Sequence, residues 1–283
     1  MSPHSLQDLS ARYPVWLCDI WGVVHDGVRC FAPALDALRR HRRNGGIVVL
    51  ITNAPRPHDV IASRLQRLGA GEAIADRIIT SGDITRALLA RHDGGKVHHI
   101  GPERDLGIFG GLNIARVPVA EADAVLCTGL LDDDTETPED YRQSFKPMIA
   151  RGLAMICANP DKIVRRGDVI LYCAGALGDL YVEMGGEVLM AGKPYAPIYD
   201  AALAAAAEAA GRPVAKREVL AIGDGPDTDI RGAAENDLDV LLIGGGVLEQ
   251  GLDVAALAAS VAATVPGARI VRTLTGLAWT AES

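Results

Sequence analysis

The sequence predicts an α/β fold: a Rossmann-like parallel sheet with a smaller α/β cap domain inserted into it. Short apolar runs that end in polar loops alternate with amphipathic stretches, and three such units occupy the first 85 or so residues. Their strand-like runs are Val15–Leu17, Ile47–Ile51 and Ala73–Thr80. Strand, loop and helix in this order predict parallel pairing with right-handed crossovers.

Helices are expected between these strands. Residues Pro33–Arg43 form an amphipathic stretch, with a proline suited to the first helical turn and Asn-Gly-Gly just after its end. Residues His58–Leu68 form the next one, closed by Gly69. We therefore expect two helices packed against the sheet.

A second series of units fills the middle of the chain. It contains strand-like runs at Val97–Ile100, Ala124–Cys127 and Leu153–Cys157, with a helical stretch at Pro138–Ala150. The last third then resumes the first pattern, with expected strands and helices at Glu187–Ala191, Pro197–Ala210, Val219–Ile222, Asp239–Ile243, Val254–Val265 and Ala268–Val271. From this order we expect a core in two parts, residues 1–84 and 187–283, and an inserted cap at 85–186.

The amino-acid composition limits the classes of binding partner that we expect. The 283 residues are 49% hydrophobic and carry a net charge of −8, which argues against nucleic acid or an anionic membrane surface as the main partner. Five cysteines without a CxxC spacing, most of them in apolar runs, indicate reduced thiols. The opening residues are polar and no apolar run reaches the roughly 18 residues of a membrane span. We therefore expect a cytoplasmic protein.

Four loops after expected strands carry polar side chains. The side chains are Asp19, Thr52 with Asn53, Lys193, and Asp224 with Asp229. Because the carboxyl ends of parallel strands meet at one edge of a sheet, these groups should converge there. Clustered carboxylates repel one another unless a cation lies between them, and Mg²⁺ prefers oxygen ligands. A hydroxyl, an ammonium and backbone N–H groups suit phosphate oxygens, so we expect a phosphate site beside Mg²⁺.

Taken alone, each of these residues has a plainer interpretation. Asp19 fits a nucleophile, a metal ligand or a polar cap on a strand end. Thr52 also fits a helix cap, Lys193 an exposed turn residue and Asp229 a helix N-cap. The residues by themselves leave these alternatives open.

In their order and content the four loops resemble the motifs of the haloacid dehalogenase (HAD) superfamily, and its class IIA, NagD-like phosphatases in particular. Asp19 in Asp-Ile-Trp-Gly-Val matches motif one, Thr52 motif two, and Lys193 in Gly-Lys-Pro motif three. Asp224 and Asp229 in Gly-Asp-Gly-Pro-Asp-Thr-Asp match motif four. About 140 residues separate motifs two and three, where class IIA members insert their cap.

The resemblance implies a Mg²⁺-dependent phosphatase with an aspartyl-phosphate intermediate on Asp19. Mg²⁺ would be held by Asp19, the backbone carbonyl of Trp21 and Asp224. Asp229 would orient Lys193 or a metal-bound water.

The phosphoryl oxygens would, by the same resemblance, contact Thr52, the following backbone amides from Asn53 on, and Lys193. We also expect Trp21 among the residues that contact the phosphate. The partner implied is a small phosphorylated molecule, chosen by the cap. A homodimer formed through the cap is also implied. For the cap face we expect Asn159, Asp161 and the stretch 175–179 to point toward the core, or to be ordinary turns and a helix start.

Trp21 departs from the family pattern. HAD phosphatases place a second aspartate two residues after the nucleophile, where it protonates the leaving oxygen and then activates water. An indole has no pKa suited to that work, and acid–base help is typically worth about 100- to 10,000-fold. His25 and Asp26 are the nearest replacements in sequence, although both suit a turn. Weak hydrolysis, a phosphate-binding or regulatory role, and phosphoryl transfer to another acceptor therefore remain as alternatives.

Overall fold

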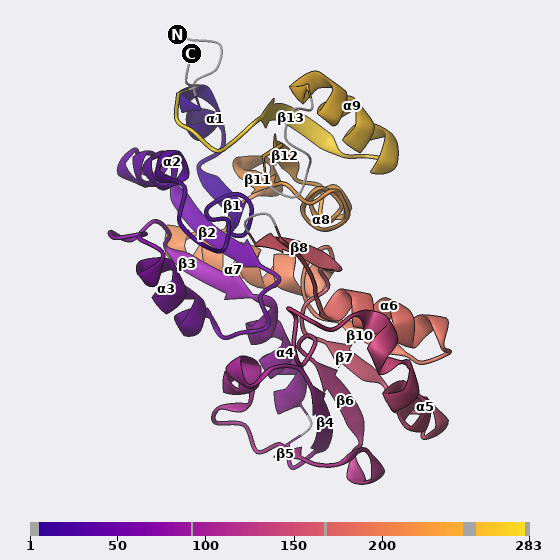
Figure 1. Cartoon of the computed structure of the whole chain (residues 1–283). Helices are drawn as coiled ribbons and strands as arrows, with labels where there is room; N and C mark the ends of the chain where they lie inside the picture. The colour runs from indigo at the N-terminus through magenta and orange to yellow at the C-terminus, as the bar shows by residue number, and fades with distance from the viewer. Residues whose placement is uncertain (1–5, 92, 167–168, 246–252, 281–283) are drawn as a thin grey trace.

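The computed structural model describes residues 6–91, 93–166, 169–245 and 253–280, which form two lobes (Figure 1). The upper lobe in that view contains a six-stranded parallel sheet in the order β13-β12-β11-β1-β2-β3. Its strands are β1 (Val15–Asp19), β2 (Ile47–Thr52), β3 (Arg77–Thr80), β11 (Val219–Gly223), β12 (Asp239–Ile243) and β13 (Arg269–Leu274). The predicted parallel α/β sheet is therefore confirmed.

The strand order explains where the polar loops meet. From β1 the chain moves outward through β2 and β3, and after the cap it returns on the other side of β1 through β11, β12 and β13. The order thus reverses between β1 and β11, and in open α/β sheets ligands bind in the crevice at such a point. The loops after β1, β2 and β11 line that crevice.

Both faces of the core sheet are covered, because successive residues of its apolar strands point to opposite faces. Trp16 and Leu50 pack with one apolar cluster, which includes residues of α1 (Gln7–Arg12), α2 (Ala32–Arg43) and α3 (His58–Arg67). Leu17 and Val49 pack with another, formed with α7, α8 and α9. These three helices span Ala196–Ala210, Arg231–Glu235 and Val254–Thr264.

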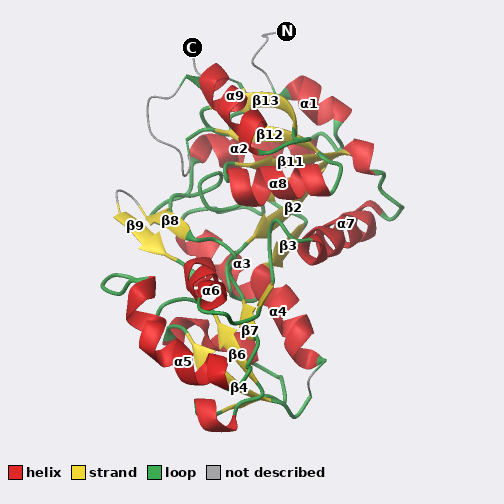
Figure 2. Cartoon of the chain, turned by 90° about the vertical axis from the view of Figure 1, so that its right-hand side faces the viewer, coloured by secondary structure: helices red, strands yellow, loops and turns green. Residues whose placement is uncertain are grey.

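The lower lobe is a smaller α/β unit (Figure 2). Its parallel sheet has the order β10-β7-β6-β4-β5, made of β4 (Lys96–Ile100), β5 (Ala115–Arg116), β6 (Ala124–Cys127), β7 (Met155–Cys157) and β10 (Val188–Met190). The helices α5 (Arg142–Ala150) and α6 (Ala174–Glu183) pack against it, and α4 (Ser81–Ala90) leads into it from the core. Between β7 and α6 a short antiparallel hairpin, β8 (Ile163–Arg166) and β9 (Val169–Tyr172), extends from this lobe.

Three features differ from the sequence-based expectations. The strand at 187–191 was assigned to the returning core, but β10 pairs with β7 in the cap sheet, with Val188 in register with Met155. The three apolar residues of β10 suit either sheet, so the sequence alone does not determine which sheet they join. Helix α1 and the β8–β9 hairpin were not predicted, and the expected helix at 138–150 begins as a 3-10 turn before α5. We propose that the cap extends to Met190 and that the second core segment starts after it.

Within the described residues, no helix combines the length and apolar character needed to cross a bilayer.

Candidate active site

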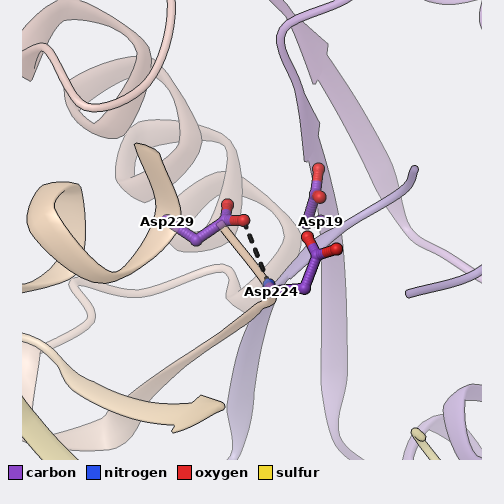
Figure 3. Close-up of side chains that lie close together, drawn as sticks. All are labelled: Asp19, Asp224 and Asp229. Atoms are coloured by element: carbon purple, nitrogen blue, oxygen red, sulfur yellow. Dashed lines mark hydrogen bonds between the residues drawn. The ribbon is translucent and has the colours of Figure 1, made fainter. Parts of the chain in front are cut away.

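Three buried carboxylates meet at the carboxyl edge of the core sheet (Figure 3). Asp19 is the last residue of β1, and Asp224 and Asp229 lie in the turn that follows β11. One oxygen of each carboxylate lies within 4.8 Å of the others, and the three residues are at most 6% exposed. The sequence-based prediction that these loops converge is therefore confirmed by their geometry.

The electrostatics of this cluster are unfavourable for three ionised groups. Burial, and next the Asp229 carboxylate, raise the pKa of Asp19 well above its ordinary value, while Lys193 opposes them. A single buried ammonium offsets only part of the charge, so the cluster has the donor set of a divalent cation site.

Lys193 lies inside this cluster and is only 2% exposed. Its Nζ donates to Asp19 Oδ1 at 2.6 Å and to Asp229 Oδ1 at 2.7 Å. Burial would lower the lysine pKa, but the two carboxylates outweigh it and hold the pKa well above its usual range. Lys193 is thus a permanently charged bridge between motifs one and four, and its interpretation as an exposed turn residue is wrong.

Asp229 organises the loop after β11. While Oδ1 receives Lys193, Oδ2 accepts the backbone N–H groups of Asp224 at 3.2 Å and Gly225 at 3.1 Å. A Cβ at Gly223 would lie 2.2 Å from Asp229 Cγ, so only glycine leaves room for this arrangement. Because Asp229 binds the loop that precedes it, it is not an N-cap of α8, whose N-cap is Ile230.

Asn53 holds Lys193 in place. Its Oδ1 accepts the Lys193 N–H at 2.7 Å, and its Nδ2 donates to the Lys193 carbonyl at 3.2 Å and to Asp161 Oδ1 at 2.8 Å. Asn53 was expected to contact phosphate through its backbone amide, and the bonds of its side chain use both side-chain N–H donors. Asn53 is therefore a positioning residue that also ties the core to Asp161 of the cap.

Thr52 is buried at the end of β2 and lines the same cavity as Asp19 and Lys193. Its Oγ1 accepts the Ala54 N–H at 3.2 Å, which leaves the hydroxyl proton available to an incoming oxygen. The next helix, α3, starts at His58 with Pro57 as its N-cap, so Thr52 is not a helix cap.

The Trp21 side chain contacts residues of both lobes. Its indole Nε1 donates to the Arg165 carbonyl of β8 at 2.7 Å, and the Arg64 guanidinium lies 5.2 Å from the ring centroid. Trp21 was expected to contact phosphate, but its indole N–H is bonded to the cap hairpin. A Cβ at Gly27 would lie 2.7 Å from the ring, and Gly27 has a φ of +89°, so this position requires glycine.

Neither candidate replacement for the missing acid is placed to serve as one. His25 Nδ1 accepts the Gly27 N–H at 2.9 Å, and burial, followed by Arg64, lowers its pKa to about 4. Asp26 Oδ1 accepts the N–H groups of Val28 and Arg29 at 2.8 Å, which is a turn-forming role. Both residues shape the loop after β1.

Two cavities lie between the lobes. The first, about 600 Å³, is lined by Asp19, Thr52, Lys193 and Asp224 and is called the aspartate cavity below. The second, about 270 Å³, adjoins it and is described further on. Of the expected cap residues, Asp161 lines both cavities and buried Asn159 lines the second. Residues 175–179 lie within α6, and Asp179 among them lines the first cavity. Arg64 and the β8–β9 hairpin were missed, because neither carries a motif.

Comparison with known proteins places this geometry in a family. Residues 16–115 match a family model described as haloacid dehalogenase-like hydrolase, and residues 190–277 match one described as HAD-hydrolase-like. No curated protein matches the chain.

Solved structures agree with the family models. A haloacid dehalogenase-like hydrolase from Brucella suis 1330 is 44% identical, with 97% of this chain and 99% of that chain covered and a TM-score of 0.88. A p-nitrophenyl phosphatase from Archaeoglobus fulgidus is 20% identical, with coverage of 94% and 97% and a TM-score of 0.70. A glycerol phosphate phosphatase from Mycobacterium tuberculosis, solved with magnesium, is 24% identical, with coverage of 97% and 78% and a TM-score of 0.71. The last two comparisons show the fold.

Proposed function

The chain belongs to the haloacid dehalogenase-like hydrolases, and we propose that it is a Mg²⁺-dependent phosphatase acting on a small phosphorylated metabolite. One observation carries the proposal: a buried carboxylate, Asp19, held by a buried ammonium, Lys193, beside a second carboxylate, Asp224. A p-nitrophenyl phosphatase and a glycerol phosphate phosphatase solved with magnesium, both of similar fold, support it. So does the position of the cap, inserted between Thr52 and Lys193 as in class IIA members.

The residues present fit a magnesium ion. Asp19, the Trp21 carbonyl and Asp224 would hold it, because Asp229 already uses one oxygen for Lys193 and the other for two backbone N–H groups. When bound, the ion would neutralise charge on the transferring phosphoryl group.

The chain's own residues divide the transfer into two steps. In the first, a carboxylate oxygen of Asp19 bonds to phosphorus as the bond to the leaving oxygen breaks, giving an aspartyl phosphate. In the second, water attacks that phosphorus, releasing inorganic phosphate and restoring Asp19. The Thr52 hydroxyl and the Lys193 ammonium contact phosphoryl oxygens, while Asn53 and Asp229 fix the lysine.

Trp21 sets the limits of this chemistry. Trp21 occupies the position of the usual acid, so we expect the leaving oxygen to receive its proton from solvent. Aryl and acyl phosphates, which leave without an acid, should therefore be cleaved better than alkyl phosphates. The aspartyl phosphate should also persist, because water lacks a base.

Release of inorganic phosphate tests the proposal. We expect p-nitrophenyl phosphate to be hydrolysed with Mg²⁺ and not with EDTA. The missing acid at Trp21 favours one alternative, a phosphate binder of low activity, which would bind phosphate with Mg²⁺ without turnover. A phosphotransferase would instead give products that change with added alcohols.

Two expectations about the protein's setting stay predictions. All five cysteines are free thiols, in keeping with the cytoplasmic location predicted from the sequence. The cap-mediated homodimer also stays a prediction, which light scattering of the purified chain would test.

A further inference from the structure

The second cavity between the lobes, called the arginine cavity here, continues from the aspartate cavity. Both are lined by Trp21, Thr52, Asp161 and Val164. Thr52 is the residue proposed to contact the phosphoryl group, so a phosphate ester bound at Asp19 has its leaving group beside this shared wall. The arginine cavity is thus the space into which the rest of the substrate can extend.

The two cavities carry opposite charge. Six carboxylates line the aspartate cavity, against the cations Lys162, Lys193 and Arg231. In the arginine cavity there are four arginines, at positions 56, 64, 104 and 166, against three carboxylates. A divalent cation suits the first cavity, and an anion suits the second.

Three of the four arginines already have carboxylate partners. Arg56 pairs with Asp105 at 2.5 Å and Arg104 with Asp133 at 2.7 Å, and Arg166 pairs with Asp134. Among the residues that the structure describes, Arg64 has no ion pair and its guanidinium makes no hydrogen bond. The unpaired charge in this cavity is therefore that of Arg64.

Arg64 is also held in place. It is half-buried on α3, and its guanidinium lies over the Trp21 ring, 5.2 Å from the centroid. The ring is fixed in turn by the hydrogen bond from its Nε1 to Arg165 of the cap. Stacking leaves the N–H groups at the guanidinium edge free to bind an anion with two parallel hydrogen bonds.

We propose that the substrate carries a second anionic group, a carboxylate or a further phosphate, on its leaving group, and that Arg64 binds it in the arginine cavity. This inference rests on the proposed function, since it names the substrate class of the same site. It also gives Trp21 a function. At the position where the HAD phosphatase pattern has an acid, this chain has a ring that supports the anion-binding Arg64.

Matched aryl phosphates test the inference. The first ester carries a para carboxylate, the second a para carboxamide of nearly the same shape, and a third a para phosphonate that distinguishes the two anions. We expect kcat/KM to favour at least one anionic ester over the carboxamide by ten- to a hundredfold, the size of a charge-assisted bidentate pair.

Variants on one helix locate the effect. Arg64→Gln should reduce that preference at least tenfold, and Arg64→Lys should restore only part of it because ammonium lacks the planar fork. Arg67→Gln is the matched control: it removes the same charge from α3, but Arg67 is exposed and does not line the cavity. The Arg67→Gln variant should favour the anionic ester over the carboxamide as strongly as the unmodified chain does.

A binding measurement separates this inference from the proposed function. Titration calorimetry with non-hydrolysable benzylphosphonates bearing the carboxylate or the carboxamide, in Mg²⁺, needs no turnover. Tighter binding of the carboxylate that is lost in Arg64→Gln supports the inference even if no ester is hydrolysed. Equal binding and equal kcat/KM for all the esters would overturn the inference. Hydrolysis of p-nitrophenyl phosphate would in that case still support the proposed phosphatase activity.

Discussion

The Nζ atom of Lys193 lies 2.6 Å from Oδ1 of Asp19, although 174 positions separate the two residues in the chain. The entire cap is inserted between them, so the contact forms only when the returning segment docks against β1. The buried ammonium contacts the strand-end carboxylate, which lines the aspartate cavity, and it opposes the rise in the pKa of Asp19 that burial causes. The proposed chemistry depends on this pair.

Replacing the nucleophile should abolish turnover. Asp19→Asn keeps the size of the side chain but removes the attacking carboxylate, so kcat for p-nitrophenyl phosphate should fall by about 1,000-fold or more. Asp227→Asn is the control, because Asp227 is exposed in the same cavity and forms an ion pair with Arg231. A control variant as inactive as Asp19→Asn would mean that general charge, rather than the nucleophile, sets the rate.

Removing the buried ammonium should destabilise the fold in the absence of metal. Lys193→Met leaves Asp19 and Asp229 facing each other without a counter-charge, a change that typically costs about 3–5 kcal/mol. Urea unfolding in EDTA measures it, and added Mg²⁺ should recover part of the loss. Lys162→Met, which breaks the exposed pair with Asp179, should cost less than about 1 kcal/mol. Equal losses in the two variants would contradict the arrangement.

Restoring an acid should change leaving-group selectivity. Trp21→Asp is expected to raise hydrolysis of alkyl phosphates relative to p-nitrophenyl phosphate, by up to about 100-fold, because the alkoxide would then receive a proton. Trp21→Phe also loses the hydrogen bond to Arg165 but adds no acid, so it isolates the proton-transfer effect. If alkyl and aryl phosphates are turned over equally well by the unmodified chain, the missing-acid explanation is wrong.

The stability should fall in mild acid because of a buried histidine. His41 stacks on Trp16 with ring centroids 3.9 Å apart, and burial lowers its pKa from 6.5 to about 4. Below pH 6.5 the unfolded chain binds a proton there that the folded chain does not, so folding loses stability as the pH falls toward 4.

Urea unfolding at pH 6.5 and pH 5 should show this effect as a difference between variants. His41→Phe keeps the stacked ring without the titration, so it should lose about 1.5 kcal/mol less than the unmodified chain over that interval. Substituting exposed His58 by glutamine is the comparison. If the free energy of unfolding of His41→Phe falls as steeply with pH as that of the unmodified chain, His41 is not the source of the effect.

Much of this molecule could be predicted from local pattern. The runs at Val15–Asp19 and Ile47–Thr52 are apolar on both faces, which is typical of central parallel strands, and each ends at the polar residue that lines the site. Strand order then brought Asp19, Thr52, Lys193 and Asp224 to one edge.

The remainder depends on contacts that no local pattern encodes. The partner of β10 is a choice between two sheets, and the three apolar residues of Val188–Met190 suit either. Asn53 was expected at the phosphate through its backbone, and the bonds of its side chain to Lys193 and Asp161 could not be predicted from the sequence. Arg64 is one of several arginines in the sequence, and only its place over Trp21 distinguishes it.

Trapping the phosphorylated residue is the most direct test of the central claim. The chain is mixed with p-nitrophenyl phosphate and Mg²⁺, quenched in acid during steady turnover, digested and examined by mass spectrometry. We predict one phosphoryl group on the peptide that contains Asp19, at a higher occupancy than in Trp21→Asp. Phosphate release with no phosphoryl group on Asp19 in either protein would contradict it.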